Sequence, residues 1–134
     1  MSDSARHVVD SSAWLEYFAD GPNAEHFAPI IEQADALLVP SITVLEVFKA
    51  IARQRDESTA IRYTAVIQQS ETVDLSADLA MRAAILGLKH RLPLADSIIY
   101  ATGQAHDALV WTQDADFDGL EGVRYLPKPR GRPQ

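Results

Sequence analysis

The stretch from Arg6 to Leu15, R-H-V-V-D-S-S-A-W-L, contains the first expected strand and the start of the first expected helix. Its β-branched residues predict a short strand over residues 6–10, which ends at Asp10. The Asp-Ser-Ser sequence is typical of a helix N-terminus, because short polar side chains accept hydrogen bonds from the first free backbone N–H groups. A short helix over residues 12–19 is therefore expected next. A strand joined directly to a helix is the repeating unit of an alternating α/β fold.

The same alternation continues along the rest of the chain. Further strands are expected at residues 36–39, 72–75 and 109–112, and the last candidate strand is 124–126. Helices are expected at 24–34, at 42–54 after a Ser41 cap, at 57–69, from Ser76 to about His90, and from Pro93 to about His106. This order predicts an α/β protein with a central parallel sheet of four to five short strands, flanked by helices.

The length of 134 residues, 47% of them hydrophobic, suits one domain, expected at residues 1–126. The remaining segment, 127–134 (P-K-P-R-G-R-P-Q), is basic and proline-rich and has no apolar anchor, so we expect a flexible tail.

No apolar stretch approaches the length of a membrane span, and the N-terminus has no signal-peptide core. The absence of cysteine excludes disulfides and thiolate zinc sites. A cytoplasmic protein that does not engage a membrane is expected.

The formal net charge of −7 argues against bulk attraction of nucleic acid. Basic residues nevertheless cluster at Lys49 to Arg55, at Lys89 to Arg91 and in the tail. A bound cation would also offset part of the negative charge.

Acidic residues occur at four separated points of the chain: Asp10, Glu46, Asp96, and Asp114 with Asp116. Asp10 and Asp114 follow short β-branched runs, where strands should end, whereas Glu46 and Asp96 lie within the first turns of expected helices. Strand ends and the loops after them gather at one edge of an α/β sheet. Carboxylates gathered there repel one another unless a divalent cation joins them. The pattern therefore indicates a hard-metal site, and metal-dependent phosphodiester cleavage is the chemistry that fits it.

Each acid also has an ordinary structural explanation. Asp10 could only cap a helix, Glu46 could pair with Lys49 on a solvated face, Asp96 could complement a helix dipole, and Asp114 could be a turn residue. Asp96 fits its alternative least well, because its immediate neighbours are apolar. The four histidines form no i, i+4 pair, and no nucleotide-binding or serine-hydrolase motif is present.

The ordered set of motifs resembles the PIN-domain ribonucleases, and more narrowly the VapC-type toxins of bacterial toxin–antitoxin pairs. The motifs that carry the resemblance are V-V-D-S-S (8–12), S-I-T-V-L-E-V (41–47), L-P-L-A-D-S-I-I-Y-A-T (92–102) and T-Q-D-A-D-F (112–117). Chain length and expected element order match as well, so the resemblance covers nearly all of the chain before the tail.

The resemblance implies a PIN-like three-layer α/β/α fold and an endoribonuclease that uses Mg²⁺ or Mn²⁺. The family's acidic quartet, which holds the metal, would fall on Asp10, Glu46, Asp96 and Asp114. Asp116 is an additional catalytic acid or a replacement for Asp114, which the spacing leaves open, and Thr112 matches the hydroxyl residue that orients the carboxylates. The implied partners are an RNA substrate, a cognate antitoxin and a second copy of the chain in a homodimer.

Lys49 and Arg53 share a helical face with Glu46, so we expect them to meet the RNA backbone; the alternative is that they only pair with surface acids. The competing function is a non-catalytic PIN-like scaffold that binds RNA or protein, which would be expected to have lost at least one acid of the quartet. A metal-dependent phosphatase is a weaker alternative, because the position two residues after Asp10 is Ser12 and the D-x-D-x-T form is absent.

Overall fold

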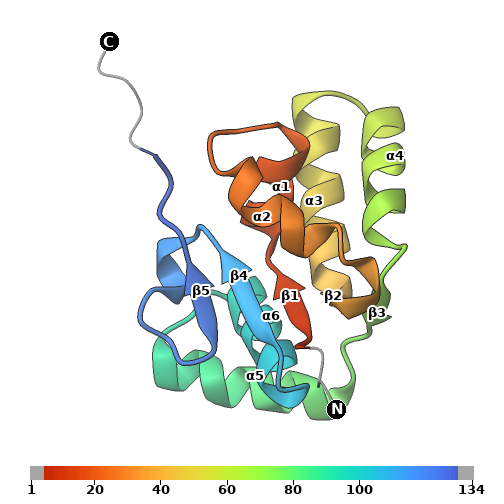
Figure 1. Cartoon of the computed structure of the whole chain (residues 1–134). Helices are drawn as coiled ribbons and strands as arrows, with labels where there is room; N and C mark the ends of the chain where they lie inside the picture. Colours follow the sequence, from red (N-terminus) through yellow and green to blue (C-terminus); the bar gives the residue numbers. More distant parts are fainter. Residues whose placement is uncertain (1–4, 130–134) are drawn as a thin grey trace.

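The computed structural model describes residues 5–129 and contains a parallel five-stranded sheet (Figure 1). The strand order is β3-β2-β1-β4-β5, and every neighbouring pair is parallel. The strands are β1 (His7–Val9), β2 (Leu37–Pro40), β3 (Glu71–Val73), β4 (Leu109–Thr112) and β5 (Val123–Tyr125). The expected parallel sheet is confirmed, with all five candidate strands present.

Six α-helices connect the strands. They are α1 (Ser11–Phe18), α2 (Ala24–Ile31), α3 (Ser41–Gln54), α4 (Glu57–Ile67), α5 (Ala77–His90) and α6 (Leu94–Ala105). Two 3-10 turns, η1 (Ala34–Ala36) and η2 (Ala115–Phe117), complete the described elements.

The central strands are buried on both faces, and alternate side chains serve opposite layers. Val9 of β1 packs in a core with residues of α1 to α4, whereas its neighbour Val8 packs in a second core that includes residues of α6. Successive strand residues point to opposite faces of a sheet, so this division follows from the period of two. The result is the expected three-layer α/β/α arrangement, with α1 to α4 on one face and α5 and α6 on the other.

The strand order positions the functional edge of the sheet. β1 is central, and the chain passes from it to β2 on one side and later to β4 on the other side. Such a reversal leaves a crevice at the carboxyl ends of the two strands, where open α/β sheets bind their ligands. Asp10 follows β1 and Asp114 follows β4, so both acids lie at this crevice.

The expected element boundaries differ from the observed ones at a few places. Ser41 is the first residue of α3, and its expected cap hydrogen bond is not made, because Pro40 occupies the N-cap position. Pro93 likewise precedes α6 as its N-cap instead of opening the helix. α2 ends at Ile31, three residues early, since the chain turns into η1 before β2. The expected tail lies outside the described residues from position 130 onward. Among the described helices, none has the length and apolar character that a membrane crossing requires.

Candidate metal centre at the carboxyl edge of the sheet

Asp10 is the most deeply buried of the five candidate acids, with only 2% of its surface exposed. Its Oδ1 accepts hydrogen bonds from the Ala13 backbone N–H, at 3.1 Å, and from the Ser12 hydroxyl, at 2.7 Å. The carboxylate therefore caps α1, as the ordinary explanation anticipated. Its Oδ2 points the other way and accepts from the Thr112 hydroxyl at 2.8 Å. Burial raises the pKa of Asp10 to about 6, although these hydrogen bonds favour the charged form.

Thr112, the last residue of β4, connects Asp10 to the acids of the next segment. Its hydroxyl donates to Asp10 and accepts from the Asp114 backbone N–H at 2.9 Å. Asp114 in turn caps η2, because its Oδ1 accepts from the Asp116 backbone N–H at 2.9 Å. One hydroxyl thus fixes Asp10 and the start of the loop that carries the other two acids.

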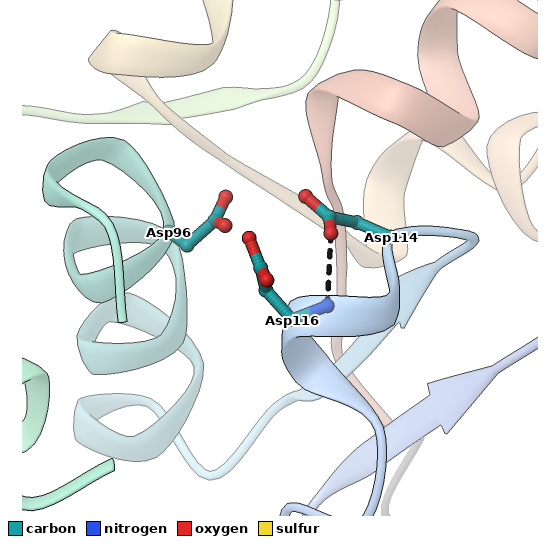
Figure 2. A group of neighbouring side chains, drawn as sticks. All are labelled: Asp96, Asp114 and Asp116. Carbon is teal, nitrogen blue, oxygen red and sulfur yellow. Dashed lines mark hydrogen bonds between the residues drawn. The ribbon is translucent and has the colours of Figure 1, made fainter. Parts of the chain in front are cut away.

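Asp96, Asp114 and Asp116 form the tightest acidic group among residues 5–129, and Figure 2 shows their carboxylates directed toward one another. Each contributes an oxygen, and these oxygens all lie within 4.8 Å of one another. Asp96 comes from the first turn of α6 and is buried, whereas Asp114 is half-buried and Asp116 is exposed. Burial, followed by the charges of Asp114 and Asp10, raises the pKa of Asp96 to about 8. We call Asp96, Asp114 and Asp116 the acidic triad.

Glu46 and Asp10 lie outside the acidic triad. Glu46 is on α3, and its Oε1 accepts a 2.6 Å hydrogen bond from the Ser11 hydroxyl, next in the chain to Asp10. The alternative of a Glu46–Lys49 ion pair is not seen: within the described range the ion pairs are Arg6–Glu71 and Arg82–Asp78. The structure thus tethers Glu46 to the residue that follows Asp10, and the five acids surround one edge of the sheet.

The donor set fits a hard divalent cation. All the candidate ligand atoms are carboxylate oxygens, which Mg²⁺ and Mn²⁺ prefer. The raised pKa of Asp96 reflects its burial first and then the like charges held close to it, and neither ion pair of the described residues brings a cation to these carboxylates. A divalent ion would relieve this repulsion, whereas protonation is the alternative available to the protein by itself.

Residues that sequence reasoning did not single out support the site. The Gln113 backbone N–H donates to the Ser12 hydroxyl at 3.3 Å, and the Gln113 side chain donates to the Ser12 carbonyl at 3.4 Å. Asn23 donates to the Gln113 side-chain oxygen at 3.0 Å. The only sequence signal for Gln113 is its place between Thr112 and Asp114, which says nothing about the side chain's partner.

Two surface grooves follow α3 beside the site. One, of about 320 Å³, is lined by Ile42, Leu45, Glu46, Lys49, Ala50 and Arg53. The other, of about 570 Å³, is mainly apolar and is lined by Ser41, Val44, Leu45, Phe48, Lys49 and Ala52. Lys49 and Arg53 are exposed, so α3 presents Glu46 and two cations along the same groove.

Comparisons with known proteins agree with this architecture. A toxin–antitoxin complex from Klebsiella pneumoniae contains a chain 25% identical to this one, with a TM-score of 0.74, covering 90% of this chain and 96% of that chain. The sarcin–ricin loop cleaving toxin VapC20 of Mycobacterium tuberculosis gives a TM-score of 0.73 at 16% identity, over 87% of this chain and 96% of that one. A chain of the DNA-bound VapBC from Salmonella typhimurium gives a TM-score of 0.69 at 14% identity, over 92% of this chain and 98% of that one. The two more distant likenesses show the fold. No curated protein sequence matches significantly.

The model of the PIN domain family matches residues 7–123, from the start of β1 to the start of β5. The match covers strands β1 to β4 completely and includes all five acids of the site. The chain therefore belongs to the PIN domain family.

Proposed function

We propose that the chain is an endoribonuclease that depends on Mg²⁺ or Mn²⁺ and acts as the toxin of a toxin–antitoxin pair. The observation that carries the proposal is the acidic triad at the switch point of the sheet, with Asp10 held beside it by Thr112. Membership of the PIN domain family and the likeness to toxin–antitoxin structures support the same reaction class. The proposed domain is residues 1–126, and we place the protein in the cytoplasm, where its RNA substrate is made.

The metal ligands that we propose are Asp10, Glu46, Asp96 and Asp114, with Asp116 as a fifth acid close to the same position. The triad geometry supports Asp114 and Asp116 together, so the two need not be alternatives. A divalent ion bound there would supply a Lewis acid and a water of lowered pKa for in-line attack on a phosphodiester.

The protein's own groups prepare this site. Thr112 and Ser12 hold the Asp10 carboxylate in one orientation, and Ser11 holds Glu46. Positioning of this kind matters because partners of metal ligands fix ligand direction and basicity. Asp96 has a raised pKa in the absence of metal and must lose its proton to bind a cation. Lys49 and Arg53 would contact substrate phosphates along the α3 groove.

An antitoxin and a second copy of the chain are the proposed protein partners. The apolar α3 groove, lined by Val44, Leu45 and Phe48, supports docking of an amphipathic segment, and its Lys49 rim lies beside Glu46. An Arg or Lys of that segment would pair with the acids and exclude the metal. For the homodimer, α5 offers an exposed apolar stripe of Met81, Ile85 and Leu88, at i, i+4 and i+7.

The alternative is a PIN-like scaffold that binds RNA or protein without cleaving it. Retention of every acid of the expected quartet, together with the close approach of three carboxylates, favours the enzyme. A scaffold that does not cleave RNA does not need all of these charges, and a single Asp→Asn change would reduce the repulsion between them.

The deciding experiment incubates the purified chain with total RNA and sequences the new RNA ends. We expect discrete ends with Mg²⁺ or Mn²⁺ and none in excess EDTA. Asp118→Asn is the matched control, because it changes an exposed acid outside the triad in the segment that carries Asp114 and Asp116. It should cleave RNA as the parent does. Undiminished cleavage in EDTA, or none with either metal, would overturn the proposal.

A further inference from the structure

The basic sequence Lys89-His90-Arg91 lies where α5 ends, directly before α6, whose first turn carries Asp96. We call these three residues the basic turn. Arg91 is five residues before Asp96 in the chain. Five residues reach at most about 18 Å even when they are fully extended, and the first turn of α6 shortens this distance. The basic turn therefore lies close to the acidic site along the chain and in space.

Packing attaches the basic turn to both elements that supply the acidic triad. The next residue of the chain, Leu92, packs against the core that contains Phe117, and Phe117 directly follows Asp116. On the other side, the His90 ring lies edge-on to the ring of Tyr100 in α6, with 5.7 Å between the ring centroids. Figure 2 shows that α6 and the segment after β4 direct their carboxylates toward each other. The basic turn thus contacts the two elements between which the triad forms.

α5 approaches α6 closely just before the basic turn. A Cβ at Gly87 would lie 3.0 Å from the Cβ of Ser97 and 3.1 Å from its hydroxyl oxygen, so only glycine allows this approach without a shift. The carbonyl of Gly87 also accepts hydrogen bonds from the backbone N–H groups of Arg91 and of Leu92, the latter at 3.0 Å. Because Ser97 follows Asp96, these contacts fix the end of α5 relative to the site.

Arg91 has a backbone conformation that favours glycine. It is the C-cap of α5, and its φ of 56° lies in the left-handed region, where the Cβ of other residues is crowded. A glycine would end the helix with less strain, so the arginine side chain is the feature that needs an explanation. Residues held in such conformations cluster at functional sites. The local explanation is that a cation near the C-terminus of α5 interacts favourably with the helix dipole.

The cations of the basic turn are free to meet an anion. Lys89 and Arg91 are exposed, and within residues 5–129 neither of them forms an ion pair. The chain as a whole carries a formal net charge of −7, and five of its acids surround the neighbouring edge of the sheet. A polyanion that approaches this edge is repelled by the carboxylates, so unpaired cations beside them are where its phosphates would be held.

We propose that Lys89 and Arg91 bind backbone phosphates of RNA on the α6 side of the acidic site. The inference rests on the proposed nuclease function and deepens it by naming substrate-binding residues in the second helical layer. Lys49 and Arg53 belong to α3 in the other layer, so the two basic groups come from opposite faces of the sheet, with the acids at its edge. An RNA strand that crosses the carboxylates is then held by cations on both sides of the cleaved bond.

The test measures binding of a fluorescein-labelled single-stranded RNA of mixed sequence over a KCl series. All proteins are full-length and carry Asp96→Asn, which prevents cleavage during the measurement, and the chain without this change is assayed for RNA cleavage in parallel. The basic-turn variant carries Lys89→Gln and Arg91→Gln. The matched control carries Arg62→Gln and Arg82→Gln, which remove the same charge from other exposed positions of α4 and α5. A charge-keeping variant carries Lys89→Arg and Arg91→Lys.

Arg91→Gly separates the two explanations of the arginine. Glycine suits the φ of 56°, so this variant should stay folded, as circular dichroism will show, while it loses one cation. We expect its slope of log K against log salt concentration to be shallower than that of the parent by about 0.7. A folded Arg91→Gly variant with the parent slope would show that the arginine acts only on its own helix, and would overturn its assignment to RNA.

We expect the slope to become shallower by about 1.4 in the basic-turn variant, because each lost phosphate contact changes it by about 0.7. The control and the charge-keeping variant should keep the parent slope. An unchanged slope in the basic-turn variant, an equal change in the control, or an equal loss in the charge-keeping variant would each overturn the inference. If RNA is cleaved while the basic-turn variant keeps the parent slope, only this inference fails. If RNA is neither bound nor cleaved, the proposed function fails, and the inference fails with it.

Discussion

At the scale of single residues, the hydroxyl of Thr112 has two tasks. It donates to Asp10 at 2.8 Å and accepts from the Asp114 backbone at 2.9 Å, so it couples an acid after β1 to the loop after β4. Thr112 is fully buried, and no solvent molecule can replace either bond without disturbing the packing. We therefore regard Thr112 as a positioning residue, which acts through the carboxylates.

Thr112→Val keeps the side-chain shape and removes the hydroxyl. RNA cleavage should fall by about 10- to 100-fold, the usual cost of losing a partner of a metal ligand. The buried Asp10 oxygen would lose a donor, at a cost of about 1–3 kcal/mol in the free energy of unfolding. Single-turnover rates and chemical denaturation measure the two effects. Thr112→Ser restores the hydroxyl and should recover most of the activity; an equally inactive Ser variant would show that the methyl packing, and not the hydroxyl, matters.

Asp96→Asn removes one ligand charge while it keeps side-chain size. Cleavage with saturating Mn²⁺ should drop by about 100-fold or more, because a lost ligand costs at least as much as a lost partner of a ligand. The control variant Asp118→Asn changes an exposed acid in the segment that carries Asp114 and Asp116, and it should cleave RNA normally. Normal cleavage by Asp96→Asn at equal protein concentration would contradict the assignment of Asp96.

At the scale of elements, most of the fold follows from local sequence patterns. Short runs with β-branched residues predicted β1, which Asp10 follows, β2, which ends at Pro40, and β4, which ends two residues before Asp114. Ser76 caps α5 through its hydroxyl, as expected. The end of α2 was less predictable, because the chain turns into the 3-10 element η1 soon after it and tertiary packing decides where the helix stops. Ser41 shows the same limit: its neighbour Pro40 already has the extended backbone of an N-cap.

The sequence also indicated which acids would lie near one another, but not that Asp96, Asp114 and Asp116 would form the closest group. Because the ends of parallel strands gather at one edge of a sheet, Asp10 and Asp114 were expected together there. The apolar neighbours of Asp96 indicated that it would be buried, as it is. Side-chain partners over long sequence distances, such as Ser11 with Glu46 or Asn23 with Gln113, have no local signature. They depend on the meeting of separate elements, which only the folded chain specifies.

The basic face of α3 gives a prediction at this scale. Lys49 and Arg53 are exposed beside Glu46, so a Lys49→Ala, Arg53→Ala double variant should bind single-stranded RNA with a salt slope shallower by about 1.4. Fluorescence anisotropy over a KCl series measures the slope. The matched control, Arg62→Ala with Arg82→Ala, removes the same charge from α4 and α5. Equal slopes in the two variants would favour the alternative that Lys49 and Arg53 are ordinary surface cations.

At the scale of the whole molecule, the buried acids make the stability of the metal-free chain depend on pH. Burial raises the pKa of Asp10 to about 6 and that of Asp96 to about 8, from an ordinary value of 3.8. Between pH 3.8 and these raised pKa values, Asp10 and Asp96 keep their protons in the folded, metal-free chain, whereas they have released them in the unfolded chain. Its free energy of unfolding therefore contains a contribution that is complete below pH 3.8 and is lost as pH rises toward about 8.

The free energies of unfolding of Asp96→Asn and of the parent are compared at each pH, so that the titration of groups that both proteins share cancels. In EDTA, Asp96→Asn should gain stability relative to the parent as pH rises from about 4 to about 8, because the parent alone loses the contribution of a protonated Asp96. Urea denaturation at several pH values measures the difference. The Asp118→Asn control should show no such trend. A difference that stays constant with pH would mean that Asp96 is not protonated in the folded apo chain.

We propose that the acids at the carboxyl edge of the sheet form one divalent-metal centre. The most direct measurement is Mn²⁺ binding at neutral pH, followed by the loss of the free-ion electron paramagnetic resonance signal on titration with the protein. We expect saturable binding by the parent and by Asp118→Asn, and strongly weakened binding by Asp96→Asn and by Asp114→Asn. Absence of binding by the parent, or binding that survives both triad changes, would contradict it.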